Sequence, residues 1–180
     1  MKTLAFGASN SRNSINKALA IYAATLLSKE VMTTDIEILD LNDFEAPIYS
    51  IDYEKEYGVP DAAKALKEKL QSANQIIISF AEHNGSYTAA YKSIFDWMTR
   101  LEGSVYDGKS MVLLSTSPGA RGGASVLATA ETSMPFFGAT VKASLSIGKF
   151  YDVFDMAAGA LKDADIKAKL IDALSAFKDG

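Results

Sequence analysis

The residues with the most evident chemistry lie at positions 7–16, Gly-Ala-Ser-Asn-Ser-Arg-Asn-Ser-Ile-Asn. The hydroxyls, amides and arginine of this segment can all donate hydrogen bonds, and no carboxylate occurs before Glu30. A strand-like stretch precedes it and a helical pattern follows, so unpaired backbone N–H groups and a helix dipole should face it. We therefore predict a phosphate site there. Its expected donors are Ser9, Ser11, Arg12, Ser14 and Asn16.

Two more polar loops follow strand-like segments. In residues 81–88, the pair Asn84-Gly85 favours a turn, and Gly85 lets the backbone approach a flat ligand. Residues 115–123 end in three glycines within five positions, directly before a helical pattern. Because the carboxyl ends of parallel strands meet at one edge of a sheet, all three loops are expected to line one site.

Each loop also has a simpler interpretation. Ser14 or Asn13 could merely cap the following helix. Ser86 could be a cap, with Glu82 and His83 solvated, and residues 115–123 could be a flexible linker. His83 is the only histidine and has no evident acid or nucleophile partner. We expect it to contact a ring or to be exposed, rather than to transfer a proton.

The elements that must position these loops follow from apolar periodicity. Strands are predicted at residues 3–6, 36–41, 76–80, 111–114 and 141–145, and helices at 15–26, 60–70, 89–101, 124–136 and 163–178. This alternation predicts an α/β fold with a doubly wound parallel sheet, in one domain over residues 1–180. The long connection at 42–59 holds Pro47, Tyr49, Tyr53 and Tyr57. Three roles stay open for this connection: it takes part in function, it packs on a partner subunit, or it covers the edge of the sheet.

Composition excludes several classes of function. The 180 residues are 48% hydrophobic, with a pI near 5.0 and a net charge of −4. An acidic protein of this kind is a poor partner for nucleic acid or an anionic membrane. The absence of cysteine excludes disulfides and thiol catalysis, and one histidine makes a metal site improbable. The sequence shows neither a signal peptide nor a membrane-spanning run, so we expect a cytoplasmic protein.

Neighbouring families with similar sheets do not match. The dinucleotide fingerprint Gly-x-Gly-x-x-Gly and the Gly-Lys-Ser/Thr triphosphate loop are absent after the first strand. The aspartate cluster of response-regulator receivers is absent too, and residues 7–16 lack the Thr-Gly of flavodoxin electron carriers.

Residues 2–174 resemble the NADPH-dependent FMN reductase family, which includes flavin, quinone, azo-dye and chromate reductases. Residues 7–16 look like its phosphate loop, Gly-Ser-x-Arg-x-x-Ser-x-Asn. Residues 82–97 look like its Glu-Tyr-Asn…Ile-Asp-Trp motif, and residues 117–123 look like its glycine-rich flavin loop. The chain departs from the pattern at Ala81, where proline is usual, at His83, where tyrosine is usual, and in the spacing that places Arg12.

The resemblance implies a flavodoxin-like three-layer sandwich, whose five parallel strands have the order 2-1-3-4-5. It implies non-covalent FMN, with NADPH or NADH passing hydride to flavin N5 and a small electron acceptor taking the electrons: a quinone, free flavin, azo compound or metal oxyanion. The loop residues 9–16 named above would hold the phosphate. Glu82, His83, Asn84 and Gly85 would line the isoalloxazine, and Ser117, Gly119, Gly122 and Gly123 would close its other side.

The family commonly forms dimers or tetramers with the active site near the subunit interface. We therefore expect a homodimer or homotetramer, with Trp97, Met98 and the tyrosine-rich segment 42–59 as contact surface. Two other interpretations stay open: a flavodoxin-like electron-transfer protein and a non-catalytic module that binds FMN or another phosphate ligand.

Overall fold

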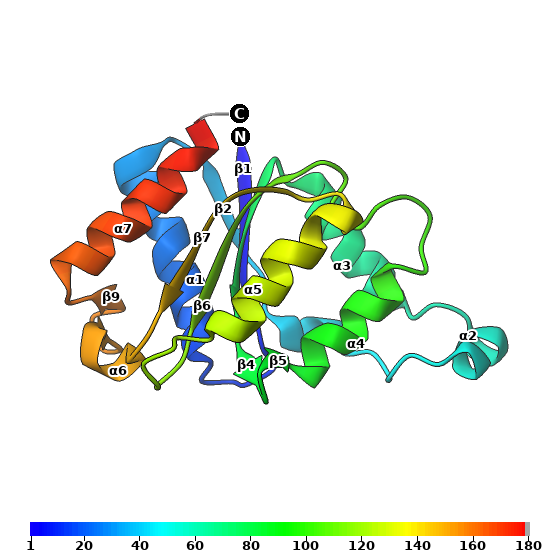
Figure 1. Ribbon diagram of the computed structural model, residues 1–180. Coiled ribbons are helices and arrows are strands. Elements are labelled where there is room, and N and C mark those ends of the chain that lie inside the picture. The colour runs from blue at the N-terminus through cyan, green and yellow to red at the C-terminus, as the bar shows by residue number, and fades with distance from the viewer. Residues whose placement is uncertain (179–180) are drawn as a thin grey trace.

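A single parallel sheet forms the centre of the computed structural model, which describes residues 1–178 (Figure 1). Its strand order is β2-β1-β3-β6-β7, which confirms the predicted 2-1-3-4-5 arrangement of the five central strands. The strands are β1 (Lys2–Ala8), β2 (Asp35–Ile38), β3 (Gln75–Phe80), β6 (Ser110–Thr116) and β7 (Thr140–Ile147). Every residue of β3 is buried, as expected for a strand covered on both faces.

Helices cover both faces and complete the three layers. On one face, α1 (Ile15–Leu26) and α7 (Ala164–Ser175) pack their leucines against Ala5, Ile77 and Val112 of the sheet. On the other face, α3 (Asp61–Ser72), α4 (Ala89–Met98) and α5 (Ala124–Ser133) enclose a second core. All five predicted helices are therefore present. None of the helices in residues 1–178 is long and apolar enough to cross a bilayer.

Short elements lie between and beside the long ones. They are η1 (Leu27–Val31), η2 (Leu41–Phe44), α2 (Ile51–Tyr57), β4 (Glu82–His83), β5 (Ser86–Tyr87), η3 (Met134–Phe137), α6 (Phe150–Val153), β8 (Phe154–Asp155), β9 (Ala160–Leu161) and η4 (Ala176–Lys178). Of these, η3 and η4 form the ends of the helices predicted at 124–136 and 163–178, and the periodicity did not predict the others. Segments of two to seven residues are too short for a periodic signal.

The predicted second strand is too long at its carboxyl end. β2 stops at Ile38, and Asp40 caps η2 by accepting a hydrogen bond from the Asn42 amide at 3.0 Å. Asp40 also pairs with Lys17 of α1. The hydrogen bond from Lys17, and after it that from the Asn42 backbone, lowers the pKa of the Asp40 carboxyl. This ion pair ties η2 to the first turn of α1.

The connection at residues 42–59 covers α4 rather than running free. The Trp97 indole donates to the Pro47 carbonyl oxygen at 2.6 Å, and the rings of Tyr49 and Tyr53 lie 5.0 and 5.7 Å from the Trp97 ring. Trp97 and Met98 are 0% and 1% exposed within their own chain, so the prediction that they form contact surface for a partner subunit is wrong. The apolar side chains that this segment does expose are Ile48, Ile51 and Tyr57.

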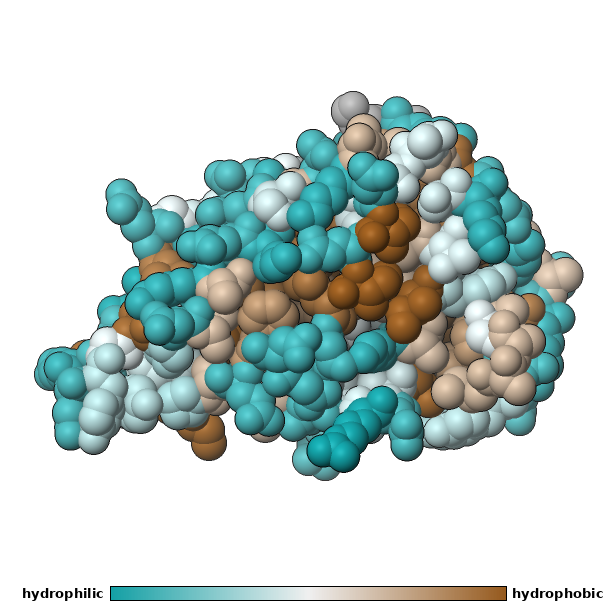
Figure 2. All heavy atoms as spheres, turned by 180° about the vertical axis from the view of Figure 1, so that it is seen from behind, coloured by the Kyte–Doolittle hydropathy of each residue, from teal (hydrophilic) through white to brown (hydrophobic). Residues whose placement is uncertain are grey.

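The face opposite to Figure 1 is polar around its rim and apolar near its middle (Figure 2). Ile38 of β2 is 37% exposed and Ile21 of α1 is 39% exposed. The polar loops after β1, β3 and β6 instead lie together at the carboxyl ends of the strands (Figure 1).

Gly7 sets how closely α1 approaches β1. A Cβ atom at this position would lie 2.5 Å from the Lys17 nitrogen and 2.7 Å from its Cα, and backbone atoms cannot rotate away.

We expect Gly7→Ala to lower the free energy of unfolding by about 3 kcal/mol, because overpacking displaces the helix. Urea denaturation tests this. The control is Gly159→Ala, where a Cβ meets nothing within 4 Å and only the left-handed φ of +63° costs about 1 kcal/mol. Equal losses in both variants would contradict steric crowding at Gly7.

Candidate functional site

The three polar loops meet around a pocket of about 250 Å³. It is lined by Ser9, Ser11, Asn13, Ser14, Ile15, Asn16, Ala81, Glu82, His83, Thr116, Ser117, Pro118 and Tyr151. Seven of the residues predicted from the sequence are among them: Ser9, Ser11, Ser14, Asn16, Glu82, His83 and Ser117. Arg12, Asn84, Gly85, Gly119, Gly122 and Gly123 belong to the same loops but do not line this pocket.

The first loop is held by two of its own hydroxyls. Ser14 caps α1 by accepting a hydrogen bond from the Lys17 amide at 3.2 Å, and Ser9 Oγ accepts one from the Ser11 amide at 3.2 Å. The simpler capping interpretation is therefore right for Ser14. Within residues 1–178, the exposed side chains of Ser11, Arg12 and Asn13 have no hydrogen-bond or ion-pair partner. Three sets of donors thus remain free at the N-terminus of α1.

Asn16 joins three parts of the site from inside. Its Oδ1 accepts hydrogen bonds from Ser79 Oγ at 2.7 Å and from the Thr116 amide at 3.0 Å. Its Nδ2 donates to the Thr116 carbonyl at 3.0 Å. The side chain is 2% exposed. Asn16 therefore fixes the start of α1 to the ends of β3 and β6.

The second loop is a β-hairpin, β4–β5, fastened to α5 at two points. Asn84 and Gly85 adopt positive φ angles of 53° and 77° and form its turn. Glu82 Oε2 accepts a hydrogen bond from the Val126 amide at 2.9 Å, in the first turn of α5. Tyr87 Oη lies 3.0 Å from Ser133 Oγ, in the last turn of the same helix. Glu82 is therefore neither simply solvated nor free.

The residue that caps α4 after this hairpin is not Ser86, the cap in the simpler interpretation. Thr88, not Ser86, caps α4, and its hydroxyl donates to the Ala8 carbonyl at 3.0 Å. His83 is exposed, and no hydrogen bond or ion pair involves its ring within the described part of the chain. It lines the pocket with no partner acid, as expected for a residue that contacts a ligand or solvent.

The third loop is fixed rather than flexible. The Gly122 carbonyl accepts hydrogen bonds from Ser115 Oγ at 2.8 Å and Ser146 Oγ at 3.1 Å. Gly122 and Gly123 have φ angles of +60° and +78°, and a Cβ on Gly122 would lie 2.6 Å from the Ile147 carbonyl carbon. The linker interpretation is wrong: Gly122 allows close packing against β7, and Gly123 lies against Ser115 of β6 and Val126 of α5.

Tyr151 is a pocket residue that the sequence did not indicate. It lies on α6, directly after β7, where the Phe150 amide donates to the Ser117 carbonyl at 3.1 Å and the Lys149 amide to the Gly119 carbonyl at 2.9 Å. These bonds hold Tyr151 beside the third loop. No local motif surrounds it, so only the fold brings it to the site.

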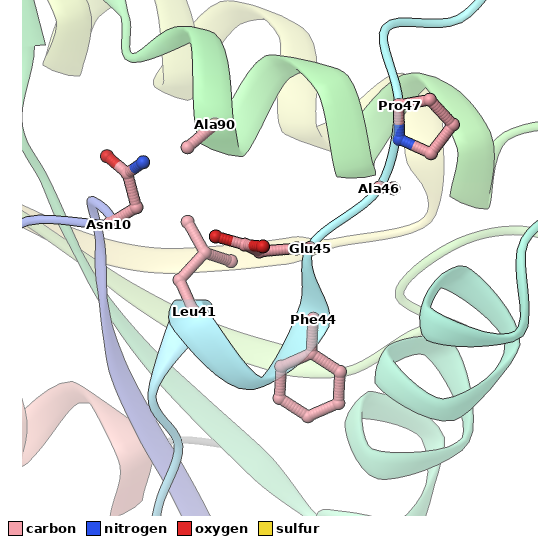
Figure 3. A pocket seen from close by; sticks show the side chains of 7 residues that line it. All are labelled: Asn10, Leu41, Phe44, Glu45, Ala46, Pro47 and Ala90. Atoms are coloured by element: carbon pink, nitrogen blue, oxygen red, sulfur yellow. The ribbon is translucent and has the colours of Figure 1, made fainter.

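A second pocket of about 390 Å³ opens on the other side of the first loop (Figure 3). Its lining consists of Asn10, Leu41, Phe44, Glu45, Ala46, Pro47 and Ala90. Asn10 stands between Ser9 and Ser11, which line the first pocket, so the two pockets flank one loop. Neither Asn10 nor Glu45 was predicted from the sequence as a site residue.

The electrostatic character of the two pockets differs. Among residues 1–178, the only carboxylate that lines the first pocket is Glu82, and an α5 amide already hydrogen-bonds one of its oxygens. Free hydroxyls, amides and the α1 N-terminus dominate there, which favours an anion. The second pocket has the carboxylate of Glu45, which disfavours one.

A comparison of the sequence with protein-family models matches residues 1–152 to NADPH-dependent FMN reductase. An uncharacterised protein of Mycoplasma pneumoniae is 30% identical over 154 residues, covering 81% of this chain and 86% of that protein. A 2-hydroxy-1,4-benzoquinone reductase of a Burkholderia species is 34% identical, covering 62% of this chain and 57% of its own length.

Solved structures share the fold. The flavoenzyme NAD(P)H:(acceptor) oxidoreductase of Paracoccus denitrificans aligns with a TM-score of 0.79 at 24% identity, covering 99% of this chain and 96% of that one. A flavodoxin mutant from Pseudomonas aeruginosa aligns with a TM-score of 0.60 at 12% identity, covering 99% of both chains. At such identities the likeness concerns the flavodoxin-like fold.

Replacing the buried amide by a carboxyl group tests the role of Asn16. In Asn16→Asp, a carboxylate oxygen would face the Thr116 carbonyl, whereas a protonated carboxyl could donate to it. Burial and this neighbour should raise the pKa of the introduced carboxyl in the folded state above the ordinary value of about 4. When the pKa of a group is higher in the folded state, its stabilising contribution is complete below the unfolded-state pKa. That contribution is lost as the pH rises through the folded-state pKa.

We therefore expect Asn16→Asp to be less stable than wild type by about 3 kcal/mol at pH 7, and by less near pH 4.5. Urea denaturation of both proteins at the two pH values measures the difference. The exposed substitution Asn13→Asp is the control and should change little. A stability deficit independent of pH would contradict the proposed role of the amide donor.

Proposed function

Because the chain belongs to the NADPH-dependent FMN reductase family, we propose that it binds FMN and carries electrons from NAD(P)H to a small acceptor. The observation that carries this proposal is the pocket in which three loops converge at the carboxyl ends of the strands. Ligands of doubly wound sheets bind at that edge. No acid–base pair or nucleophile is needed, because a flavin supplies the redox chemistry and the protein supplies position.

The donors of the first loop suit the FMN phosphate. Ser11, Arg12 and Asn13 have free side-chain donors, and the N-terminus of α1 adds backbone N–H groups and a favourable dipole. Ser14, Ser9 and Asn16 would shape the loop through their internal hydrogen bonds. The phosphate would therefore be held mainly by residues 11–14.

The second and third loops suit the flavin ring. His83, Asn84 and Gly85 form an exposed turn whose backbone a flat ring can approach, while Glu82 keeps this turn fixed to α5. Ser117 and Pro118 line the same pocket as His83, and Gly119, Gly122 and Gly123 belong to their loop. When bound, FMN would take a hydride at N5 from NAD(P)H and deliver two electrons to the acceptor.

The proposed acceptor is a quinone. Two relatives are named 2-hydroxy-1,4-benzoquinone reductase and quinone reductase, the latter from Escherichia coli. The chain spans 57% and 43% of these relatives, so the acceptor is tested directly on this protein. Free flavin, azo compounds and metal oxyanions are the comparison substrates.

We also propose a homodimer or homotetramer, with contacts through the exposed apolar residues of the 42–59 segment. Ile48 is 84% exposed, Ile51 56% and Tyr57 65%, on a segment that extends away from the sheet (Figure 1). A monomeric mass at micromolar concentration in light scattering would refute this.

The visible spectrum after incubation with FMN and desalting tests the cofactor. Retained flavin bands are expected, and anaerobic NADPH should bleach them. Flavin that is retained but not bleached would favour an electron carrier that needs a partner protein. A colourless protein would favour a module that binds another phosphate ligand.

Arg12→Ala should weaken FMN binding by about tenfold, because it removes one charge-assisted hydrogen bond to the phosphate. A fluorescence titration of apoprotein measures the dissociation constant. Lys29→Ala removes the same charge beyond the far end of α1 and should leave the affinity unchanged. An unchanged affinity in Arg12→Ala would remove this residue from the phosphate site.

His83→Ala should lower turnover with NADPH and a quinone more than it lowers FMN retention, because an exposed ring in the pocket wall contacts substrate. Steady-state rates and flavin content of the same preparation are compared. If both fall in proportion, His83 has a structural role instead.

A further inference from the structure

We propose that the second pocket binds the adenosine half of the nicotinamide coenzyme and that Glu45 makes the enzyme prefer NADH to NADPH. This inference rests on the proposed function, in which the nicotinamide half reacts at a flavin in the first pocket. It names a ligand for the second pocket, which the FMN proposed for the first pocket would leave empty.

The walls of the second pocket suit a flat, uncharged ring. Leu41 and Phe44 come from η2, Ala46 and Pro47 from the segment after it, and Ala90 from the first turn of α4. The cavity of about 390 Å³ falls within the size range of small-molecule sites, which are mostly apolar with a few polar groups. An adenine ring could pack against such walls.

The polar groups of this pocket are free to bind a ligand. Figure 3 shows the Glu45 side chain reaching between Leu41 and Ala90, with Asn10 across from it on the first loop. Neither side chain has a hydrogen-bond or ion-pair partner within residues 1–178. A carboxylate accepts hydrogen bonds and does not donate them, so Glu45 suits a ligand with O–H or N–H donors, as ribose hydroxyls are.

The position of the pocket favours a long ligand over the acceptor itself. An acceptor must lie within about 3.5 Å of the flavin atom that reduces it. The second pocket is separated from the proposed ring site by the first loop, whose Asn10 faces one pocket while Ser9 and Ser11 face the other. A dinucleotide can occupy both sides of that loop, whereas a single small ring cannot.

The charge of Glu45 gives the proposed coenzyme preference. The 2′-phosphate of NADPH carries close to two negative charges, and NADH has a hydroxyl there. Repulsion between the Glu45 carboxylate and the 2′-phosphate, together with the lost donor, should disfavour NADPH by roughly five- to tenfold. In the part of the chain that the structure describes, no cation lines this pocket to offset the repulsion.

Titrations of the FMN-loaded protein with adenosine 5′-phosphate and adenosine 2′,5′-bisphosphate test the site without catalysis. Wild type should bind the first about five- to tenfold more tightly. Glu45→Gln should abolish this difference, and Ala90→Leu should weaken both ligands by filling the cavity. Asp43→Asn is the matched control, since it removes one exposed charge from η2 without lining the pocket.

Anaerobic stopped-flow reduction of the bound flavin supplies the second readout. NADH, NADPH and reduced nicotinamide mononucleotide are compared, because the last lacks adenosine. Glu45→Gln should lower the preference for NADH over NADPH to near unity and leave the mononucleotide unaffected.

Equal binding of the two adenosine phosphates by wild type, or an unchanged preference in Glu45→Gln, would overturn the inference. An effect of Glu45→Gln on the quinone KM alone would assign the pocket to the acceptor and overturn it too. Failure of the proposed function is separate: wild type would then retain no FMN or resist reduction by either coenzyme. If wild type retains no FMN, the same titrations are made on the FMN-free protein, because binding of the adenosine phosphates needs no turnover.

Discussion

The geometry of the site depends on the buried amide of Asn16. An α/β sheet brings the ends of its strands to one edge, but it does not fix how the loops beyond them are arranged. Asn16 does so by satisfying Ser79 of β3 and both backbone groups of Thr116 from the first turn of α1. Because the amide is a donor and an acceptor in one group, no apolar or carboxylate side chain can replace all three bonds. The phosphate loop is thereby held in register with the two loops that face it.

The fold was predictable because its signals are long and redundant. β3 is fully buried and holds the apolar run Ile76–Ile78, and long strands and long helices alternate along the chain, so the order of elements leaves few topologies. Capping by Ser14 was the alternative to its predicted role as a phosphate donor, and it follows from a hydroxyl that stands directly before a helical pattern. In both cases the residues that determine the local structure lie within a few positions of it in the sequence.

The parts of the site that could not be predicted from the sequence depend on contacts between distant residues. Glu82 accepts a hydrogen bond from Val126, 44 positions away, so its carboxylate is a helix cap rather than a solvated group. Trp97 is covered by Pro47 and Tyr49, which no periodicity of α4 could reveal. Tyr151 reaches the pocket only because β7 ends beside the third loop. In each case the residue type was visible in the sequence, but its partner was not.

The contrast between the two pockets follows from their loops. The first is built at the start of α1, where unpaired backbone amides and uncharged side chains create a positive end without a bound cation. The second is built at the end of η2, whose start is fixed by the Lys17–Asp40 ion pair and whose next residue is Glu45. One short loop separates a site that attracts anions from one that repels them. Two phosphorylated ligands could therefore share this edge of the sheet without competing for one anion site. This requires that a phosphate lies at the first pocket and that hydroxyls, rather than a phosphate, lie at the second.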